Sequence, residues 1–234
     1  MIAGRGVTED NYLVFVTRNG TVKRTAQSAF KNIRSNGIRA LSLDEGDELI
    51  SVLQTTGEDK ILLATHDGMA ICFAETDARA MGRDAVGVRG IRLREGDYVV
   101  GAGIAAEGAA ILSITENGYG KRTPIEEYRI TNRGGKGVKT INITEKTGKL
   151  ISIQAVTDEN DLMIINRSGL TIRTAVDQIR VAGRATQGVR IINLREGDAI
   201  ASVIAVPANE EEEPAVLDGA GAPESESEEN VSKE

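Results

Sequence analysis

The stretch Asn117-Gly118-Tyr119-Gly120-Lys121-Arg122-Thr123 decides the fold, because it follows an apolar run and recurs along the chain. Asn-Gly between two strand-like runs predicts a β-hairpin with a type I′ turn, in which both central residues have φ > 0. The corresponding turn glycines are 48, 50 and 51 residues apart, at Gly20, Gly68, Gly118 and Gly169. The chain is therefore built from repeats.

A second marker keeps the same period. It is a seven-residue segment that begins with glycine, has a basic residue at its third position and has leucine or isoleucine at its fifth and seventh positions. It occurs at 37–43, 87–93, 137–143 and 188–194. Its glycines are 50, 50 and 51 residues apart. Two markers in register predict four units, each with about four strands and little helix. Apolar residues at alternate positions of this marker are expected to pack one unit on the next: Leu41, Leu43, Ile91, Leu93, Ile141, Ile143, Ile192 and Leu194.

An all-β repeat of about 50 residues predicts small sheets arranged radially, because a single four-stranded sheet has too little core alone. We expect units near residues 11–59, 60–108, 109–160 and 161–207. The first unit lacks an upstream strand of the kind that the others inherit, so we expect the chain to begin partway through a larger array. Residues 1–10 and the acidic segment 208–234 are expected to be disordered.

Composition narrows the class of protein further. Aromatic residues make up only 3% of the chain and tryptophan is absent, so the core must consist of aliphatic residues. The single cysteine, Cys72, excludes an internal disulfide and a cysteine zinc site. No apolar run approaches the ~20 residues of a membrane span, and the N-terminus does not resemble a signal peptide. These features predict a cytoplasmic protein that does not associate with membranes.

The charge of the chain is divided unevenly. The net charge of −7 combines a tail from Ala208 that carries −9 with a body that carries +2. The basic residues of the body recur at fixed positions of the repeat, after the hairpin turn, after the second glycine and between the two markers. Such a division predicts a basic working surface with an acidic appendage.

Basic residues at one repeated position line up along one rim of a radial array, as a polyanion backbone requires. No aromatic residues are interleaved, so stacking on single strands is disfavoured and duplex DNA, held through its phosphates, fits better. The predicted DNA-binding residues are Lys23, Arg24, Arg34, Arg39, Arg83, Arg89, Arg92, Lys121, Arg122, Arg133, Lys136, Lys139, Arg173, Arg184 and Arg190.

Two other classes of function stay open. The basic residues can be ordinary solvated surface of a propeller-like scaffold that binds proteins. An enzyme is disfavoured, because His66 has no partner nearby in sequence, Cys72 lies at a strand position typical of core, and the repeated Gly and Asp residues are turn formers. We therefore expect no cofactor, no metal and no small-molecule substrate.

Three segments resemble one known family. The stretch from Asn117 to Thr123, the pair of Ala80–Arg83 with Gly87–Leu93, and Gly183–Val189 are similar to the C-terminal domain of the DNA gyrase A subunit. The resemblance covers residues 7–207, and the acidic tail is similar as well. It implies an all-β, six-bladed β-pinwheel that wraps duplex DNA on a basic outer rim, and so supports ATP-dependent negative supercoiling. It also implies two partners, the gyrase A breakage-reunion domain and the gyrase B subunit.

The sequence departs from that family pattern in three ways. Only four units are visible. The family's Gln-Arg-Arg-Gly-Gly-Lys/Arg-Gly box is absent as such, and 131–137 echoes it without the leading Gln-Arg. Nothing resembles the breakage-reunion domain or the ATPase subunit, so the chain by itself is expected to have no catalysis. The related C-terminal domain of the topoisomerase IV A subunit remains an alternative, because its number of blades varies.

Overall fold

The computed structural model describes residues 11–32 and 36–208. The expectations for residues 1–10, for the tail from 209 to 234 and for Arg34 therefore concern residues outside the described part of the chain. Within it, the secondary structure is strand with four short 3₁₀ turns, η1 to η4, at Gln27–Phe30, Glu75–Asp77, Ile125–Glu127 and Val176–Gln178. The predicted all-β class and the four repeats are confirmed.

Each unit is built on one β-hairpin that contains the first marker. The four hairpins are β1 (Tyr12–Thr17) with β2 (Thr21–Ala26), β4 (Lys60–Thr65) with β5 (Met69–Ala74), β8 (Ala110–Thr115) with β9 (Tyr119–Pro124), and β12 (Asn160–Asn166) with β13 (Thr171–Ala175). All four pairs are antiparallel. The alternation of apolar residues that predicted strands at these positions is confirmed.

The type I′ turn predicted for these hairpins is wrong. No residue other than glycine has a positive φ in the described part of the chain, so Asn19 and Asn117 do not take the left-handed conformation. Instead Gly118 N donates to Thr115 O (3.0 Å), and Gly118, with φ of 81°, is the residue of this loop that takes the left-handed conformation. This is a type I turn closed by a left-handed glycine, a three-residue hairpin loop that the Asn-Gly pair also suits.

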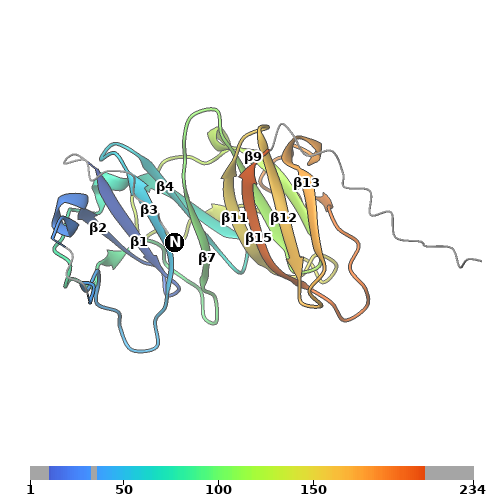
Figure 1. Ribbon diagram of the computed structural model, residues 1–234. Coiled ribbons are helices and arrows are strands. Elements are labelled where there is room, and N and C mark those ends of the chain that lie inside the picture. The colour runs from blue at the N-terminus through green and yellow to red at the C-terminus, as the bar shows by residue number, and fades with distance from the viewer. Residues whose placement is uncertain (1–10, 33–35, 209–234) are drawn as a thin grey trace, which may run out of the picture.

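A third strand from the same unit lies toward the centre of the array. These inner strands are β3 (Leu49–Thr55), β7 (Val99–Ile104), β11 (Leu150–Val156) and β15 (Ile200–Pro207). Each pairs antiparallel with the first strand of its own hairpin. Neighbouring inner strands also contact one another, β3 with β7, β7 with β11 and β11 with β15 (Figure 1).

The fourth strand of each of the first three sheets comes from the next unit. The second marker forms the two-residue strands β6 (Val88–Arg89), β10 (Val138–Lys139) and β14 (Val189–Arg190). They pair with β2, β5 and β9 of the preceding unit, which gives sheet orders β3-β1-β2-β6, β7-β4-β5-β10 and β11-β8-β9-β14. The expectation of about four strands per unit is confirmed in the second, third and fourth units, each of which supplies three strands to its own sheet and donates one to the preceding sheet.

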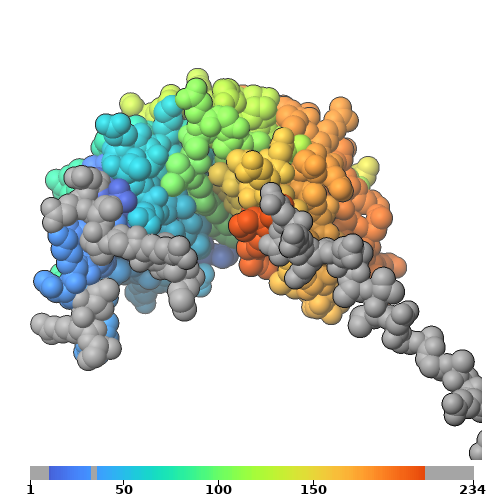
Figure 2. Space-filling model, turned by 45° about the horizontal axis from the view of Figure 1, so that its top comes forward, coloured from blue at the N-terminus to red at the C-terminus, as the bar shows by residue number. Residues whose placement is uncertain are grey.

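The hydrophobic core lies between units, as the apolar positions of the second marker predicted. One cluster joins Val14 and Val16 of the first unit to Ile61 and Leu63 of the second. Equivalent clusters join the second unit to the third and the third to the fourth. Ile91, Ile141 and Ile192 are buried in these clusters. Burial of each sheet face therefore depends on its neighbour, and Figure 2 shows the units following one another along an arc.

The two ends of the array lack this arrangement. Residues 37–43 form no strand, and Leu43 is 43% exposed, although the sequence predicted a strand there. At the other end, the fourth sheet contains only β13, β12 and β15 among the described residues. Gly20, Gly68 and Gly118 lie against Ile91, Ile141 and Ile192 of the following unit, whereas Gly169 has open space beside it.

The backward donation brings two backbones very close at one glycine of each junction. A Cβ atom on Gly137, whose φ is 73°, would lie 2.2 Å from Ala70 O on β5. Gly96 has a similar φ of 75° but nothing within 4 Å of the same position. Both glycines avoid backbone strain, and only Gly137 also permits a close approach of strands.

We expect Gly137→Ala to lower the free energy of unfolding by about 2 kcal/mol more than Gly96→Ala, because it adds a steric clash to the same backbone strain. The free energies of both variants and the unmodified chain are measured by urea unfolding. Equal losses in the two variants would contradict the donated-strand geometry at β10.

Candidate nucleic-acid interface

The donated strands carry basic side chains on the outer edge of each sheet. Arg89 lies opposite Thr21, Lys139 opposite Met69 and Arg190 opposite Tyr119, and all three basic residues are exposed. Since β6, β10 and β14 are the strands farthest from the inner strands in their sheets, these side chains lie on the outside of the array. The sequence prediction that the second marker places basic residues along one rim agrees with these positions.

A second set of arginines lies in the loops between the markers and reaches back to the preceding unit. Arg83 Nη1 donates to Arg39 O (3.3 Å), Arg133 Nη1 to Arg89 O (3.1 Å) and Arg184 Nη1 to Lys139 O (3.0 Å). Each loop arginine thus lies beside the basic residue of the neighbouring second marker. We call the resulting row the basic rim, and define it as Arg39, Arg83, Arg89, Arg133, Lys139, Arg184 and Arg190.

Arg190 is held in place by Tyr119. The Arg190 Nε and Nη2 atoms donate to Tyr119 Oη at 3.2 and 2.8 Å, and these hydrogen bonds lower the pKa of the tyrosine. Lys146 and Arg195 line the same small cavity as Arg190, so three basic residues meet at this end of the rim. The sequence pattern did not select Tyr119, Lys146 or Arg195. Tyr119 could have been selected if the pairing of the second marker with the first marker of the preceding unit had been known, because this pairing places Arg190 opposite Tyr119.

Three further predicted residues are exposed. Arg92 and Lys136 lie in the loops beside the basic rim, where Arg92 N donates to Gly135 O (2.8 Å). Arg173 lies on β13, the outer strand of the fourth sheet, and its Nε donates to Asp161 Oδ2 (2.7 Å). All three are available to solvent, although the ion pair neutralises part of the Arg173 charge.

Lys23 and Lys121 are not on the surface, although the sequence placed them among the DNA-binding residues. Lys121 has no exposed area, and its Nζ donates to Gly183 O, Arg184 O (2.8 Å) and Thr186 Oγ1 (3.2 Å). Lys23 is 1% exposed and its Nζ donates to Ala40 O (2.7 Å) and Arg83 O. Both side chains point under the loop of the following unit, because alternate residues of a strand face opposite sides of the sheet.

Arg24 and Arg122 are also buried, each at a junction between units. Arg24 lies 3.5 Å from Glu75, a carboxylate that is 1% exposed, and its guanidinium stacks on Tyr12. Arg122 donates to Ile179 O (2.7 Å), Asp177 O (2.9 Å) and Asp158. Neither guanidinium is accessible to a phosphate, so the residues that follow the hairpin turn are structural in the first and third units.

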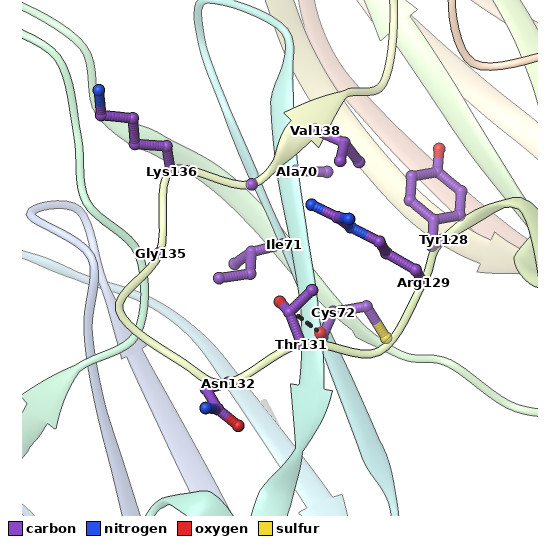
Figure 3. Close-up of a pocket in the computed structure, with 11 residues that line it drawn as sticks. Ala70, Ile71, Cys72, Tyr128, Arg129, Thr131, Asn132, Gly135, Lys136 and Val138 are labelled. Atoms are coloured by element: carbon purple, nitrogen blue, oxygen red, sulfur yellow. Dashed lines mark hydrogen bonds between the residues drawn. The ribbon is translucent and has the colours of Figure 1, made fainter.

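The second unit has Ile71 and Cys72 where its neighbours have lysine and arginine. A cavity of about 260 Å³ lies there, under the loop 131–137 (Figure 3). The Arg129 guanidinium points into this cavity, whereas the Lys136 ammonium points away from it. Burial raises the pKa of the Cys72 thiol, as expected for a core residue rather than a nucleophile.

No acid–base constellation accompanies His66 among the described residues. Its ring stacks on Tyr98 at 4.5 Å, its Nδ1 lies 2.9 Å from Leu150 O, and its Nε2 lies 4.0 Å from Glu116. The contacts with Leu150 and Glu116 join the second unit to the third. Within residues 11–32 and 36–208, no cluster of three or more histidine, cysteine or acidic residues is placed to hold a metal ion. In the same ranges, no helix has the length and apolar character needed to cross a bilayer.

Burial lowers the pKa of Lys121 to about 8, against about 10.4 for an unfolded lysine. Between these values the unfolded chain binds a proton that the folded chain has released, so Lys121 makes stability rise with pH in this window. We expect the unmodified chain to gain about 2 to 3 kcal/mol of unfolding free energy relative to Lys121→Met between about pH 7.5 and pH 10.5.

Urea unfolding at several pH values measures this difference. The matched control is Lys139→Met, which removes an exposed lysine of the neighbouring rim and should keep the pH profile of the unmodified chain. A Lys121→Met variant with the same profile as Lys139→Met would show that the buried ammonium is not the titrating group.

Comparisons with known proteins agree with this architecture. The family model described as "DNA gyrase C-terminal domain, beta-propeller" matches residues 11–56, 59–106, 110–157 and 160–207. The DNA gyrase A subunit of Staphylococcus aureus (strain MRSA252) is 49% identical over 208 residues, which are 88% of this chain and 24% of that protein. The chain therefore spans about a quarter of the length of the curated relatives it matches.

Solved structures lead to the same family. The structure described as the C-terminal domain of DNA topoisomerase IV superposes with a TM-score of 0.81 and 26% identity, over 87% of this chain and 64% of that one. The structure of a DNA gyrase A C-terminal domain gives a TM-score of 0.77 and 26% identity, over 86% of this chain and 67% of that one. This chain belongs to the family of DNA gyrase C-terminal β-propeller domains.

Proposed function

We propose that the chain binds duplex DNA along the basic rim and bends it around the outside of the array. The observation that carries this proposal is the repetition of one arrangement at three successive junctions, where a loop arginine lies beside the basic residue of the neighbouring second marker. A row of cations with a regular spacing matches a regular row of phosphates and carries no sequence information. The interface is therefore expected to bind duplexes of many sequences.

The curvature of the array supports bending rather than straight binding. The units follow an arc (Figure 2), so a duplex that contacts the rim of several units must follow that arc. Bending costs about 1 to 6 kcal/mol for 20 to 30 base pairs. Many phosphate contacts offset such a cost when no single contact is strong, as in other proteins that wrap DNA.

The chain acts in this proposal as part of a larger enzyme. Relatives that it matches are DNA gyrase A subunits, so we propose two partners, the gyrase A breakage-reunion domain and the gyrase B subunit. Wrapping would present a DNA crossing of fixed hand to the strand-passage site and support ATP-dependent negative supercoiling. The chain itself would supply no catalysis, and a cytoplasmic location stays a prediction.

The main competing function is that of the topoisomerase IV C-terminal domain, whose structure superposes with the higher TM-score of the two compared above. The 49% identity to gyrase A subunits favours the gyrase assignment. The other alternative is a scaffold that binds proteins and has no role in DNA binding. It predicts that the chain does not bind DNA, or that its affinity for DNA does not depend on the basic rim.

We expect replacement of Arg89, Lys139 and Arg190 by glutamine to weaken binding of a duplex of about 40 base pairs and to reduce its salt dependence. Each lost phosphate contact lowers the slope of log affinity against log salt by about 0.9, so loss of all three lowers it by about 3. Fluorescence anisotropy at several salt concentrations measures both quantities. The triple variant should unfold at the same urea concentration as the unmodified chain, because these side chains are exposed.

Lys60→Gln is the matched control for charge. Lys60 is an exposed residue at the start of β4, which lies two strands inward from β10 in its sheet. Its removal should leave the salt slope unchanged. Equal slopes for the triple variant and the unmodified chain would refute the basic rim as the DNA-binding surface.

We expect relaxed circular plasmid to retain a change in linking number when it is incubated with the chain and closed by a separate topoisomerase I. The reason is that an arc of fixed hand constrains a DNA crossing of fixed sign. Gel electrophoresis in chloroquine measures the change and its sign. Binding without a change in linking number would restrict the proposal to DNA binding and refute wrapping by these four units.

A further inference from the structure

We propose that Lys23 and Lys121 position the arginines of the basic rim from beneath, and that neither lysine contacts DNA. This inference rests on the proposed function, because it assigns a role in DNA binding to residues with no access to DNA. It is carried by the geometry of two junctions, between the first and second units and between the third and fourth. The middle junction, where Ile71 stands in place of the lysine, provides the contrast.

The Lys121 ammonium gathers three oxygen atoms of one loop. Its Nζ donates to the carbonyls of Gly183 and Arg184 and to the hydroxyl of Thr186, which in turn donates to Gly183 O (2.9 Å). A lysine ammonium has three donors and no acceptor, so this set uses its full capacity. Three oxygen atoms of the loop 183–186 thereby point inward to the Lys121 ammonium.

Arg184, whose carbonyl accepts one of these hydrogen bonds, is a residue of the basic rim. The carbonyl of Arg184 accepts from Lys121, while the guanidinium of Arg184 donates to Lys139 O (3.0 Å) on the preceding donated strand. The Arg184 backbone N also donates to Glu127 Oε2 (3.0 Å). Lys121 therefore anchors the main chain of an arginine whose side chain lies beside Lys139 on the outer surface.

Lys23 repeats this connection two units away. Its Nζ donates to Arg83 O, and the Arg83 guanidinium donates to Arg39 O (3.3 Å). Lys23 also donates to Ala40 O (2.7 Å), so it joins the loop of the second unit to the second marker of the first. Two independent copies of one arrangement make an accidental contact a poor explanation.

The middle junction shows what happens without the lysine. Ile71 has no donor, and a cavity lies under the loop 131–137 instead. Arg133 is held from outside, by bonds from its Nε to Asp77 O (2.9 Å) and from its Nη1 to Arg89 O. Loss of the lysine in the other two junctions would remove a charged donor from part-buried carbonyls such as Arg83 O and Arg184 O, which is unfavourable unless the loop moves.

A double-mutant cycle on DNA affinity separates positioning from direct contact. Lys121→Met and Arg184→Gln should each weaken duplex binding by about threefold to tenfold. If Lys121 acts through Arg184, the double variant should bind no more weakly than the weaker single variant. Lys121→Met combined with Arg89→Gln, at a distant junction, is the matched control, and there the two effects should multiply.

Hydrogen exchange without DNA tests the loop directly. Lys121→Met should speed exchange of the backbone amides of Arg184 and Thr186, while the equivalent amides of Arg133 and Gly135 keep their rates. Thr186→Val, which removes one acceptor and keeps the lysine, should speed exchange less. This milder variant preserves the test if Lys121→Met fails to fold.

The results of these experiments distinguish failure of the proposed DNA binding from failure of the positioning role of Lys121. No DNA binding by the unmodified chain would refute the proposed function, and effects that multiply in both cycles would refute positioning by Lys121. A further drop of about 0.9 in the salt slope when Lys121→Met is added to Arg184→Gln would indicate a direct phosphate contact by Lys121 and also overturn the inference. Unchanged amide exchange in Lys121→Met would overturn it without any use of DNA.

Discussion

The structure depends on the backward donation of one short strand from each unit to the one before it. Only two residues of each donated strand pair in the ladder, but the following apolar residue, such as Ile91, is buried between the two units. The hydrophobic clusters also lie between sheets rather than within them. A unit without its neighbours would therefore lose both its outer strand and one face of its core, so the array is stable only as an array.

This dependence also places the charges. The third residue of the second marker faces solvent because successive side chains of a strand point to opposite faces, and the residue before it, Val88, packs against the core. Each donated strand consequently brings one basic residue, such as Arg89, to the outer edge of the sheet that it completes. The interaction that joins the units and the surface proposed to hold DNA are formed by the same segment, so displacement of its backbone is expected to disturb both.

Two kinds of repeated basic residue have different tasks for a geometric reason. Those after the second glycine lie on outer edge strands and are exposed. Lys121 and Arg122, after the hairpin turn, lie on a strand that the following unit covers, and their long side chains carry cationic groups to backbone carbonyls of that unit. A count of basic positions along the sequence cannot separate these tasks, because both sets repeat with the same period.

The sequence by itself determined the all-β class, the four repeats and the apolar junction residues, because hydrophobic periodicity and turn glycines act within about ten residues of each other. It also selected the residues that form the basic rim. The tertiary structure alone decided that the second marker pairs with the preceding unit, that Lys23 and Lys121 are buried, and that Tyr119 supports Arg190. These features depend on contacts between residues about 60 to 70 positions apart, and no local pattern records which distant segment covers a strand.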